Sequence, residues 1–284
     1  MCKEQVLPRI VFCDLDGTLL ATDKSMSDRT RRALRGLAMR DILFVPSTGR
    51  SVAGLPSEVI ALAHAQYAVT ADGASIYRLT PAGHESLRMC QVDRNMALGL
   101  LRLVHAIGSY IDVFSDGEAY VERGELDKLD DMPLLSDDRA YIRRVRNEID
   151  QPLEEFVAQG HAVERLTVFY TNLDTRARII AYARDSGGLA CYTSGAANIE
   201  VTSSDVSKGS ALLWLCRHLG VSPSQTLAFG DSMNDVPMLR EAGVGIAMSN
   251  AREGVREQAD GQTRLDNDHS GVAEYLEELL CIQS

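Results

Sequence analysis

The sequence has no long hydrophobic run, no cysteine-rich motif and no surplus of basic residues. No apolar stretch approaches the roughly 20 residues that a membrane-spanning helix needs. The short apolar stretch near the N-terminus is interrupted by Asp14 and Asp16, and no small-residue cleavage site follows it. We therefore expect a soluble protein of the cytosol with no membrane partner.

The sequence is poor in basic residues and in closely spaced metal ligands, which argues against a nucleic-acid-binding site and against a zinc site. The chain carries 29 Lys and Arg against 40 Asp and Glu, so its net charge is -11. A phosphate backbone would meet a repulsive average field, which argues against a nucleic acid partner. The six cysteines include no C-x-x-C pair and no histidine at metal-ligand spacing. We expect reduced thiols rather than a zinc site.

Strand-like and helix-like segments alternate in the first third of the chain. Apolar, β-branched runs at 9–13, 42–45 and 67–70 predict buried strands. A helix capped by Ser27 and another around 56–65 separate these strands. The alternation favours right-handed crossovers, and therefore a Rossmann-like, doubly wound parallel sheet with helices on both faces.

The last third of the chain repeats the same alternation. An apolar helical stripe ends at Gly220, which is the residue type expected just after a helix. Beyond it the sequence predicts a strand at 226–229, a helix at 236–242, a strand at 244–248, a helix after Asn250 and a final helix at 272–280.

The middle of the chain, 81–196, has a different pattern. A D-G turn signal between β-rich segments predicts a hairpin over 110–121, and a strand and a helix are predicted at 166–170 and 175–185. The acidic run 125–138 predicts a solvated connection or a short helix. Strands clustered beside helices favour a separate α+β domain.

Length and pattern together predict two domains. At 284 residues and 45% hydrophobic content, the chain can bury two cores of ordinary size without disulfides. We expect an α/β core made of residues 1–80 and 197–284, with the α+β domain 81–196 inserted between them.

Two carboxylates stand at the end of the first predicted strand. Asp14 and Asp16 are two residues apart, so in an extended segment their side chains point to the same side. Ligands bind at this end of the strands in open α/β sheets. Two adjacent carboxylates repel unless a cation lies between them or one keeps its proton. Similar pairs also occur in calcium-binding loops and turn caps, so this pattern alone leaves both roles open.

Polar residues also follow the other predicted strands. Thr48 and the N–H groups of 47–50 can hold a phosphate oxygen or cap the next helix. Lys208, at the start of a helix, is either a cation of the site or a solvated surface residue. Asp231 and Asp235 add two acids at a second strand end. Four acids at two strand ends, with one lysine, form an oxygen-rich pocket that suits Mg²⁺.

The four segments around Asp14, Thr48, Lys208 and Asp231 resemble the motifs of the haloacid dehalogenase-like superfamily of phosphohydrolases, and they occur in the same order along the chain. The closer resemblance is to the Cof-type subfamily (subclass IIB), which carries an α/β cap domain between its second and third motifs. Further matching stretches are 72–74, 206–209, 228–231 and 247–251. The resemblance implies that 81–196 is a cap domain that selects the substrate.

Two positions depart from the family pattern. The family usually has Asn where this chain has Asp72, and Asp where this chain has Ser270. Neither position belongs to the four motifs, so the departures concern substrate contacts and loop packing rather than the chemical step.

The resemblance also implies catalytic and metal-binding roles. Asp14 corresponds to the nucleophile that becomes an aspartyl-phosphate, and Asp16 to the general acid and base. Mg²⁺ would be held by the Asp14 carboxylate, the backbone carbonyl of Asp16 and the Asp231 carboxylate, which would let an anionic phosphate approach an anionic nucleophile.

The remaining motif residues correspond to those that bind the phosphoryl group. Asp235 would orient Lys208 or a metal-bound water, and Arg50 would contact the phosphate or form a structural ion pair. The resemblance assigns the phosphoryl oxygens to the Leu15 N–H group, Thr48, the Gly49 backbone and Asn234, with Lys208 offsetting their charge.

The expected activity is that of a Mg²⁺-dependent phosphatase acting on a small phosphorylated metabolite such as a sugar phosphate. One alternative is a phosphomutase, since the same fold and motifs can return the phosphoryl group to a sugar. The other is a catalytically silent regulatory module that binds metal and ligand.

Overall fold

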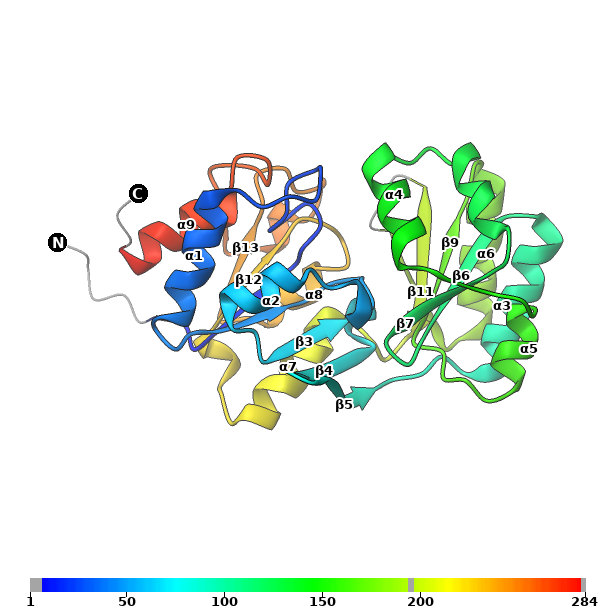
Figure 1. Cartoon of the computed structure of the whole chain (residues 1–284), viewed down its shortest axis with the longest axis horizontal. Coiled ribbons are helices and arrows are strands. Elements are labelled where there is room, and N and C mark those ends of the chain that lie inside the picture. Colours follow the sequence, from blue (N-terminus) through cyan, green and yellow to red (C-terminus); the bar gives the residue numbers. More distant parts are fainter. Residues whose placement is uncertain (1–6, 194–196, 282–284) are drawn as a thin grey trace. The chain divides into compact units, whose positions relative to one another are not determined.

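The computed structural model describes residues 7–193 and 197–281, which form two compact units (Figure 1). The first unit contains the chain up to Gly49, Leu55–Leu87 and the chain from Ser207 onward. The second unit contains Arg50–Gly54 and Arg88–Val206.

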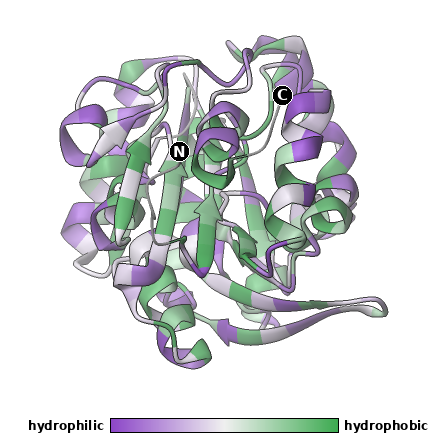
Figure 2. Ribbon diagram, turned by 90° about the vertical axis from the view of Figure 1, so that its left-hand side faces the viewer, coloured by the Kyte–Doolittle hydropathy of each residue, from purple (hydrophilic) through white to green (hydrophobic). Residues whose placement is uncertain are grey.

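A five-stranded parallel sheet forms the centre of the first unit. Its strand order is β14-β13-β12-β1-β2, and every neighbouring pair is parallel. Helices cover parallel sheets on both faces, so their strands are continuously hydrophobic, and the central strands in Figure 2 are mostly green. The strands are β1 (Ile10–Cys13), β2 (Leu43–Pro46), β12 (Thr226–Gly230), β13 (Val244–Ala247) and β14 (Gly261–Gln262).

The direction of winding reverses between β1 and β12. The chain passes from β1 to β2 on one side of the sheet and from β12 to β13 on the other. Because crossovers are right-handed, their helices lie on opposite faces, and a crevice opens at the carboxyl ends of β1 and β12. One group of packed helices is α1 (Asp28–Ala38), α2 (Ser57–Ala63) and α9 (Gly271–Leu280), and the other is α7 (Lys208–Leu219) and α8 (Val236–Glu241).

A second, three-stranded sheet extends the first unit. It consists of β3 (Tyr67–Thr70), β4 (Ser75–Thr80) and β5 (Gly83–Met89), in that order. The predicted strand 67–70 therefore exists, but it pairs antiparallel with β4 and meets the parallel sheet through a single parallel bridge between Ser47 and Val69.

The second unit contains a six-stranded sheet in which all neighbours are antiparallel except β7 and β8. In spatial order the strands are β10 (Leu189–Tyr192), β11 (Asn198–Ser203), β9 (Arg165–Phe169), β6 (Tyr110–Ser115), β7 (Glu118–Glu122) and β8 (Asn147–Ile149). Its helices are α3 (Arg94–Ile107), α4 (Ser136–Val145), α5 (Leu153–Ala158) and α6 (Leu173–Ser186).

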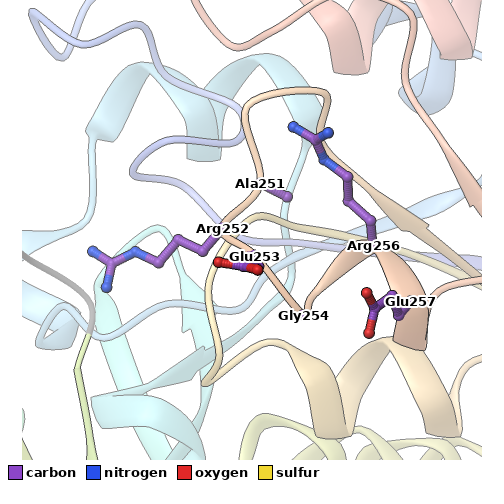
Figure 3. Close-up of a pocket in the computed structure, with 6 residues that line it drawn as sticks. All are labelled: Ala251, Arg252, Glu253, Gly254, Arg256 and Glu257. Carbon is purple, nitrogen blue, oxygen red and sulfur yellow. The ribbon is translucent and has the colours of Figure 1, made fainter.

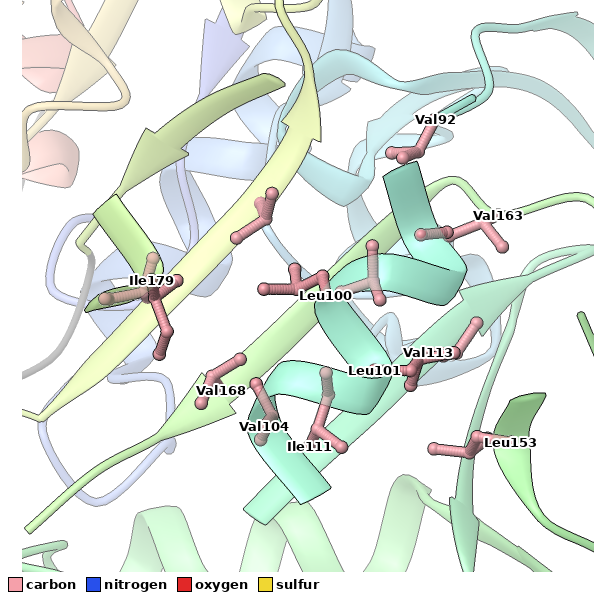
Figure 4. Packing of buried hydrophobic residues seen from close by; sticks show 14 of the residues in the cluster. Val92, Leu100, Leu101, Val104, Ile111, Val113, Leu153, Val163, Val168 and Ile179 are labelled. Carbon is pink, nitrogen blue, oxygen red and sulfur yellow. The ribbon is translucent and has the colours of Figure 1, made fainter. Parts of the chain in front are cut away.

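One hydrophobic core holds this sheet against α3, α5 and α6 (Figure 4). Leu100 and Leu101 of α3 pack with Val113 of β6 and Val168 of β9, and all four are fully buried.

The mixed architecture predicted for the whole chain is confirmed. The units divide at Leu87/Arg88 and Val206/Ser207 rather than at 80/81 and 196/197, because β5 pairs with β4 whereas β11 pairs with β9.

Local signals in the sequence located several element ends correctly. Ser27 caps α1 by accepting the Thr30 N–H, and Gly220 ends α7 with a left-handed backbone. The predicted hairpin turns at Asp116-Gly117 between β6 and β7. The helix expected after Asn250 is wrong. That segment is irregular apart from a single 3-10 turn, Arg256–Gln258.

Within residues 7–193 and 197–281, no helix combines the length and the apolar character that a bilayer crossing requires. Cys13, Cys90, Cys191 and Cys216 are free, as expected. Cys281 is disulfide-bonded, so the expectation of six reduced thiols is wrong at this position.

A substitution in the core of the second unit should destabilise the protein strongly. Leu166 of β9 is fully buried in that core, so Leu166→Ala leaves a cavity and should cost about 2–5 kcal/mol. The matched control is Leu173→Ala, because the Leu173 side chain is 76% exposed and its loss should cost less than about 0.5 kcal/mol. Urea unfolding followed by circular dichroism measures both, and equal losses would contradict the described packing.

Candidate active site

The register of two neighbouring strands brings the first and last motifs together. Cys13 of β1 pairs with Phe229 of β12, and the Asp14 N–H donates to the Phe229 carbonyl at 3.0 Å. Asp14 therefore lies beside the loop that begins at Gly230 and Asp231. Both loops leave the sheet at the crevice where the winding reverses, which is where α/β sheets bind ligands.

A buried lysine connects the two strand ends. The Lys208 Nζ lies 2.6 Å from Asp14 Oδ1 and 2.6 Å from Asp235 Oδ1. Lys208 is the first residue of α7, which Ser207 and Ser210 cap reciprocally, so the helix start fixes its position. The side chain is 1% exposed, so the solvated alternative is excluded for this lysine.

Asp235 supports both the lysine and the loop after β12. Its Oδ1 binds Lys208, and its Oδ2 accepts the N–H groups of Asp231 and Ser232, both at 3.0 Å. The close approach requires glycine at position 230, because a Cβ there would lie 2.4 Å from the Asp235 Cβ. Both oxygens of Asp235 are therefore committed to contacts within the protein.

The Asp231 carboxylate is held by two hydroxyl groups. Thr18 Oγ1 donates to Asp231 Oδ1 and Ser232 Oγ donates to Oδ2, each at 3.1 Å. The turn after Asp14 passes close to this carboxylate at Gly17, whose φ is +81°. A Cβ at Gly17 would lie 2.8 Å from an Asp231 oxygen, so this turn also requires glycine.

Burial and neighbouring negative charges raise the pKa values of Asp14 and Asp231. Burial raises the pKa of Asp14, and the neighbouring Asp235 and Asp231 reinforce the shift while Lys208 opposes it. Burial, with Asp235 nearby, raises the pKa of Asp231 to about 6. Burial alone would lower the pKa of Lys208, but its carboxylate neighbours outweigh burial and keep it above its usual range.

The arrangement fits a divalent cation bound by two of the three acids. Carboxylate oxygens of Asp14, Asp231 and Asp235 lie within 4.8 Å of one another. Asp235 already binds the Lys208 ammonium and two backbone N–H groups, whereas the Asp231 oxygens accept only hydroxyl groups and Lys208 contacts one Asp14 oxygen, so Asp14 and Asp231 are the better candidates for ion ligands. Burial first, and then the neighbouring carboxylates, disfavour the ionised forms of Asp14 and Asp231, and an oxygen-bound cation would stabilise those forms.

A model of haloacid dehalogenase-like hydrolases matches residues 11–276. The chain belongs to this family. The resemblance seen in the sequence, including the Cof-type subfamily, is confirmed.

Several known proteins are similar to the chain over most of its length. The phosphatase YwpJ of Bacillus subtilis is 30% identical, covering 96% of this chain and 100% of its own. An HMP-PP phosphatase of an Enterobacter species is 30% identical over 86% of this chain and 85% of its own. The solved structure of a haloacid dehalogenase-like hydrolase from B. subtilis has a TM-score of 0.83 and 27% identity, covering 95% of this chain and 99% of that one.

Asp16, the second carboxylate of the first motif, has a different ion-pair partner from the neighbouring acids Asp14 and Asp235. Its Oδ1 lies 3.1 Å from the Lys24 Nζ, and its side chain is 36% exposed. The structure therefore groups Asp14, Asp231 and Asp235 around Lys208 and connects Asp16 to Lys24. Sequence reasoning missed Lys24, because a lysine in the turn after a motif has no distinguishing pattern.

The residues predicted to hold a phosphoryl group lie on two loops. Thr48 follows β2, and its N–H donates to the Val69 carbonyl at 2.9 Å. Asn234 lies in the loop after β12, where its Nδ2 donates to Asp72 Oδ1 at 2.8 Å. The Asp72 N–H in turn donates to the Thr48 carbonyl at 3.2 Å, so Asp72 connects the two loops.

The other groups predicted to contact phosphate belong to the backbones of Leu15 and Gly49. Leu15, between the two motif aspartates, is fully buried, and Gly49 directly follows Thr48. Their contacts with a phosphoryl group stay predictions.

Arg50 makes contacts of a structural kind. Its guanidinium donates to the Gly54 carbonyl at 3.2 Å and lies 4.2 Å from the centre of the Tyr141 ring. These contacts belong to the second unit, which contains residues 50–54. A phosphate contact by Arg50 stays a prediction.

The two positions expected to depart from the family pattern differ in their surroundings. Ser270 precedes α9, and its hydroxyl lies 2.7 Å from the Ser27 hydroxyl at the start of α1. It therefore contributes to helix packing. Asp72 contacts Asn234 directly, so the residue at position 72 determines the surroundings of a side chain predicted to bind phosphate.

Two other features can be separated from the site. A pocket in the turn after β13 is lined by residues 251–254, 256 and 257, none of them predicted for the site (Figure 3). In the second unit, His105 Nδ1 lies 2.9 Å from Glu154 and Nε2 lies 3.5 Å from Glu122. One ligand atom from each of these three residues lies within 4.8 Å of the others, but the two carboxylates contact different ring nitrogens, so ion pairing with His105 explains the cluster without a metal.

Removing the charge of Asp231 should reveal its role. An acid whose pKa is raised stabilises the folded state below its usual pKa, and this contribution is lost as the pH rises through about 6. At pH 7, Asp231→Asn should therefore raise the melting temperature of the metal-free protein. It should also abolish the increase that Mg²⁺ causes in the wild type, because a ligand is lost.

Calorimetry with Mg²⁺ or with chelator measures both effects. The matched control is Glu253→Gln, which neutralises an exposed acid of the same unit and should leave the Mg²⁺ effect unchanged. An Asp231→Asn protein that keeps the full Mg²⁺ effect would show that Asp231 is not a ligand.

Proposed function

We propose that the chain is a Mg²⁺-dependent phosphatase that hydrolyses a phosphomonoester of a small metabolite, such as a sugar phosphate, through an aspartyl-phosphate. The observation that carries this proposal is the buried Asp14 carboxylate, which Lys208 fixes beside Asp231 at the end of two adjacent parallel strands. The phosphatases among its relatives, such as YwpJ, support the same reaction class.

In the first step, an Asp14 carboxylate oxygen attacks phosphorus and the bond from phosphorus to the ester oxygen breaks. Asp16 donates a proton to that leaving oxygen, which departs as an alcohol. The pair between Asp16 and Lys24 has to open before Asp16 can carry this proton. Asp14 then carries the phosphoryl group as a mixed anhydride.

In the second step, water replaces Asp14 on phosphorus. The Asp16 carboxylate takes a proton from the water, whose oxygen attacks phosphorus, and the bond from phosphorus to Asp14 breaks. Inorganic phosphate leaves, the Asp14 carboxylate is restored, and Asp16 is again protonated. One metabolite ester and one water give one alcohol and one phosphate.

The charges around Asp14 decide whether an anionic ester can approach. Asp14, Asp231 and the backbone carbonyl of Asp16 would hold Mg²⁺, which would supply positive charge to offset the repulsion between nucleophile and phosphate. Lys208 adds a second fixed positive charge and holds Asp14 in place. Thr48 and Asn234, with the backbone of Leu15 and Gly49, are the proposed contacts of the phosphoryl oxygens.

The substrate class follows the acidic composition and the family. We propose a small phosphorylated metabolite of the cytosol, with neither nucleic acid nor membrane as partner. A phosphomutase would return the phosphoryl group to a sugar, and an assay for isomer formation separates this alternative from phosphate release. A silent binding module would have no need of Asp14, Asp16, Lys208 and Asp231, all of which are present.

Loss of the attacking charge should abolish turnover. Asp14→Asn keeps the size of the side chain but removes the nucleophile, so kcat should fall by about three orders of magnitude or more. Phosphate release from a panel of phosphorylated sugars, nucleotides and cofactors measures the effect, with Glu253→Gln as control. A variant, checked for deamidation, that retains more than about a tenth of the wild-type rate would exclude Asp14 as the nucleophile.

We also propose that the second unit selects the substrate. The proposed catalytic residues Asp14, Asp16, Lys208 and Asp231 belong to the first unit, so exchanging Arg88–Val206 for the equivalent segment of a relative should preserve the chemistry. The ranking of kcat/KM among substrates should change, whereas Mg²⁺ dependence should persist. A folded chimera with the original ranking would assign specificity to the first unit.

A further inference from the structure

A buried carboxylate lies beside a residue predicted to bind phosphate. Asp72 is 1% exposed and Asn234 is 4% exposed. Asp72 Oδ1 accepts a hydrogen bond from Asn234 Nδ2 at 2.8 Å. Two polar side chains from distant parts of the sequence are thus paired inside the first unit, directly after β3 and β12.

The backbone at Asp72 is held in an uncommon conformation. Ala71 and Asp72 both have left-handed backbones, with φ of 48° and 59°, and Gly73 follows with φ of 101°. Non-glycine residues adopt this region at an energetic cost, so it persists where the surroundings enforce it. Here the Asp72 N–H is held by the Thr48 carbonyl, and Gly73 packs so closely on Ser207 that a Cβ would lie 2.3 Å from its carbonyl oxygen.

A carboxylate constrains an amide neighbour more than another amide does. An ionised carboxylate only accepts hydrogen bonds, so the nitrogen of the Asn234 amide has to face Asp72. An asparagine at position 72 could donate or accept, and would allow the Asn234 amide to turn over. This chain therefore fixes one of two orientations.

The fixed orientation leaves an oxygen without a partner. Asn234 Oδ1 is buried, and no donor reaches it from residues 7–193 or 197–281. A buried acceptor without a hydrogen bond costs about 1–3 kcal/mol, and a ligand that brings a donor removes this cost. The remaining N–H of the same amide is available to a phosphoryl oxygen.

We propose that Asp72 is a positioning residue for phosphate binding, which holds the Asn234 amide in the single orientation that receives the phosphoryl group. This inference rests on the proposed function, because it takes Asn234 as a phosphate contact. Asp72 does not touch the phosphoryl group. It acts through Asn234, and its backbone N–H ties the same loop to Thr48.

Two substitutions distinguish the effect of the Asp72 carboxylate from the effect of its left-handed backbone. Asp72→Gly removes the carboxylate without strain, since glycine adopts a left-handed backbone freely. Asp72→Asn keeps an acceptor oxygen and tolerates that backbone, but permits the Asn234 amide to turn over. Asp41→Gly is the matched control, because Asp41 is an exposed aspartate whose φ is also positive, at 54°.

Calorimetric titration of the full chain with inorganic phosphate in the presence of Mg²⁺ measures the effect. We expect Asp72→Gly to weaken phosphate binding about tenfold, Asp72→Asn to weaken it less, and Asp41→Gly to leave it unchanged. In steady-state assays the KM should rise more than kcat falls. Melting temperatures should stay close to that of the wild type.

A double-mutant cycle tests whether Asp72 acts through Asn234. In an Asn234→Ala background, Asp72→Gly should have almost no further effect on phosphate binding, because the group that it positions is gone. Additive losses, or an Asp72→Gly protein that binds phosphate like the wild type, would overturn the inference while leaving the phosphatase proposal intact.

The proposed function can fail separately. A wild type that binds phosphate with the expected coupling between Asp72 and Asn234, but hydrolyses no ester, would refute the phosphatase and support the positioning role. A wild type that neither hydrolyses esters nor binds phosphate would overturn both.

Discussion

The buried ammonium of Lys208 is the interaction on which the rest of the site depends. It lies between Asp14 and Asp235, at 2.6 Å from each, and almost no solvent reaches it. Removing one partner of such a buried pair leaves an uncompensated charge, which typically costs about 3–5 kcal/mol. Lys208 therefore aligns the proposed nucleophile and, through Asp235, holds the loop that carries Asp231. With three acids and one lysine, the cluster remains negative and suits a divalent cation.

The sheet topology explains why these residues meet. The winding reverses between β1 and β12, so the loops after these strands open into the same crevice, and α7 delivers Lys208 to it. Gly17 and Gly230 allow the loops to approach the Asp231 and Asp235 side chains more closely than any Cβ would permit. The precision of the site thus comes from strand register and close backbone packing.

Much of this arrangement was predictable from the sequence, since short-range patterns encode it. Buried strands read as β-branched runs, and the motif acids directly follow them, so Asp14 and Asp231 were expected at one edge of the sheet. The partner of an individual polar side chain was not predictable. The contact of Asp16 with Lys24 and that of Asp72 with Asn234 depend on turn conformations that composition does not determine. The prediction of a helix after Asn250 was wrong because the sequence pattern there is too short to specify a helix.

The central claim is that Asp14 becomes covalently phosphorylated during turnover. The most direct measurement is to mix the enzyme with Mg²⁺ and an active substrate, quench in acid within the first turnover, and map the peptides by mass spectrometry. The account predicts one phosphoryl group on the peptide that contains Asp14, which forms and decays at rates compatible with kcat and is removed by hydroxylamine. Turnover without any phosphorylated peptide, or with the phosphoryl group on another residue, would contradict it.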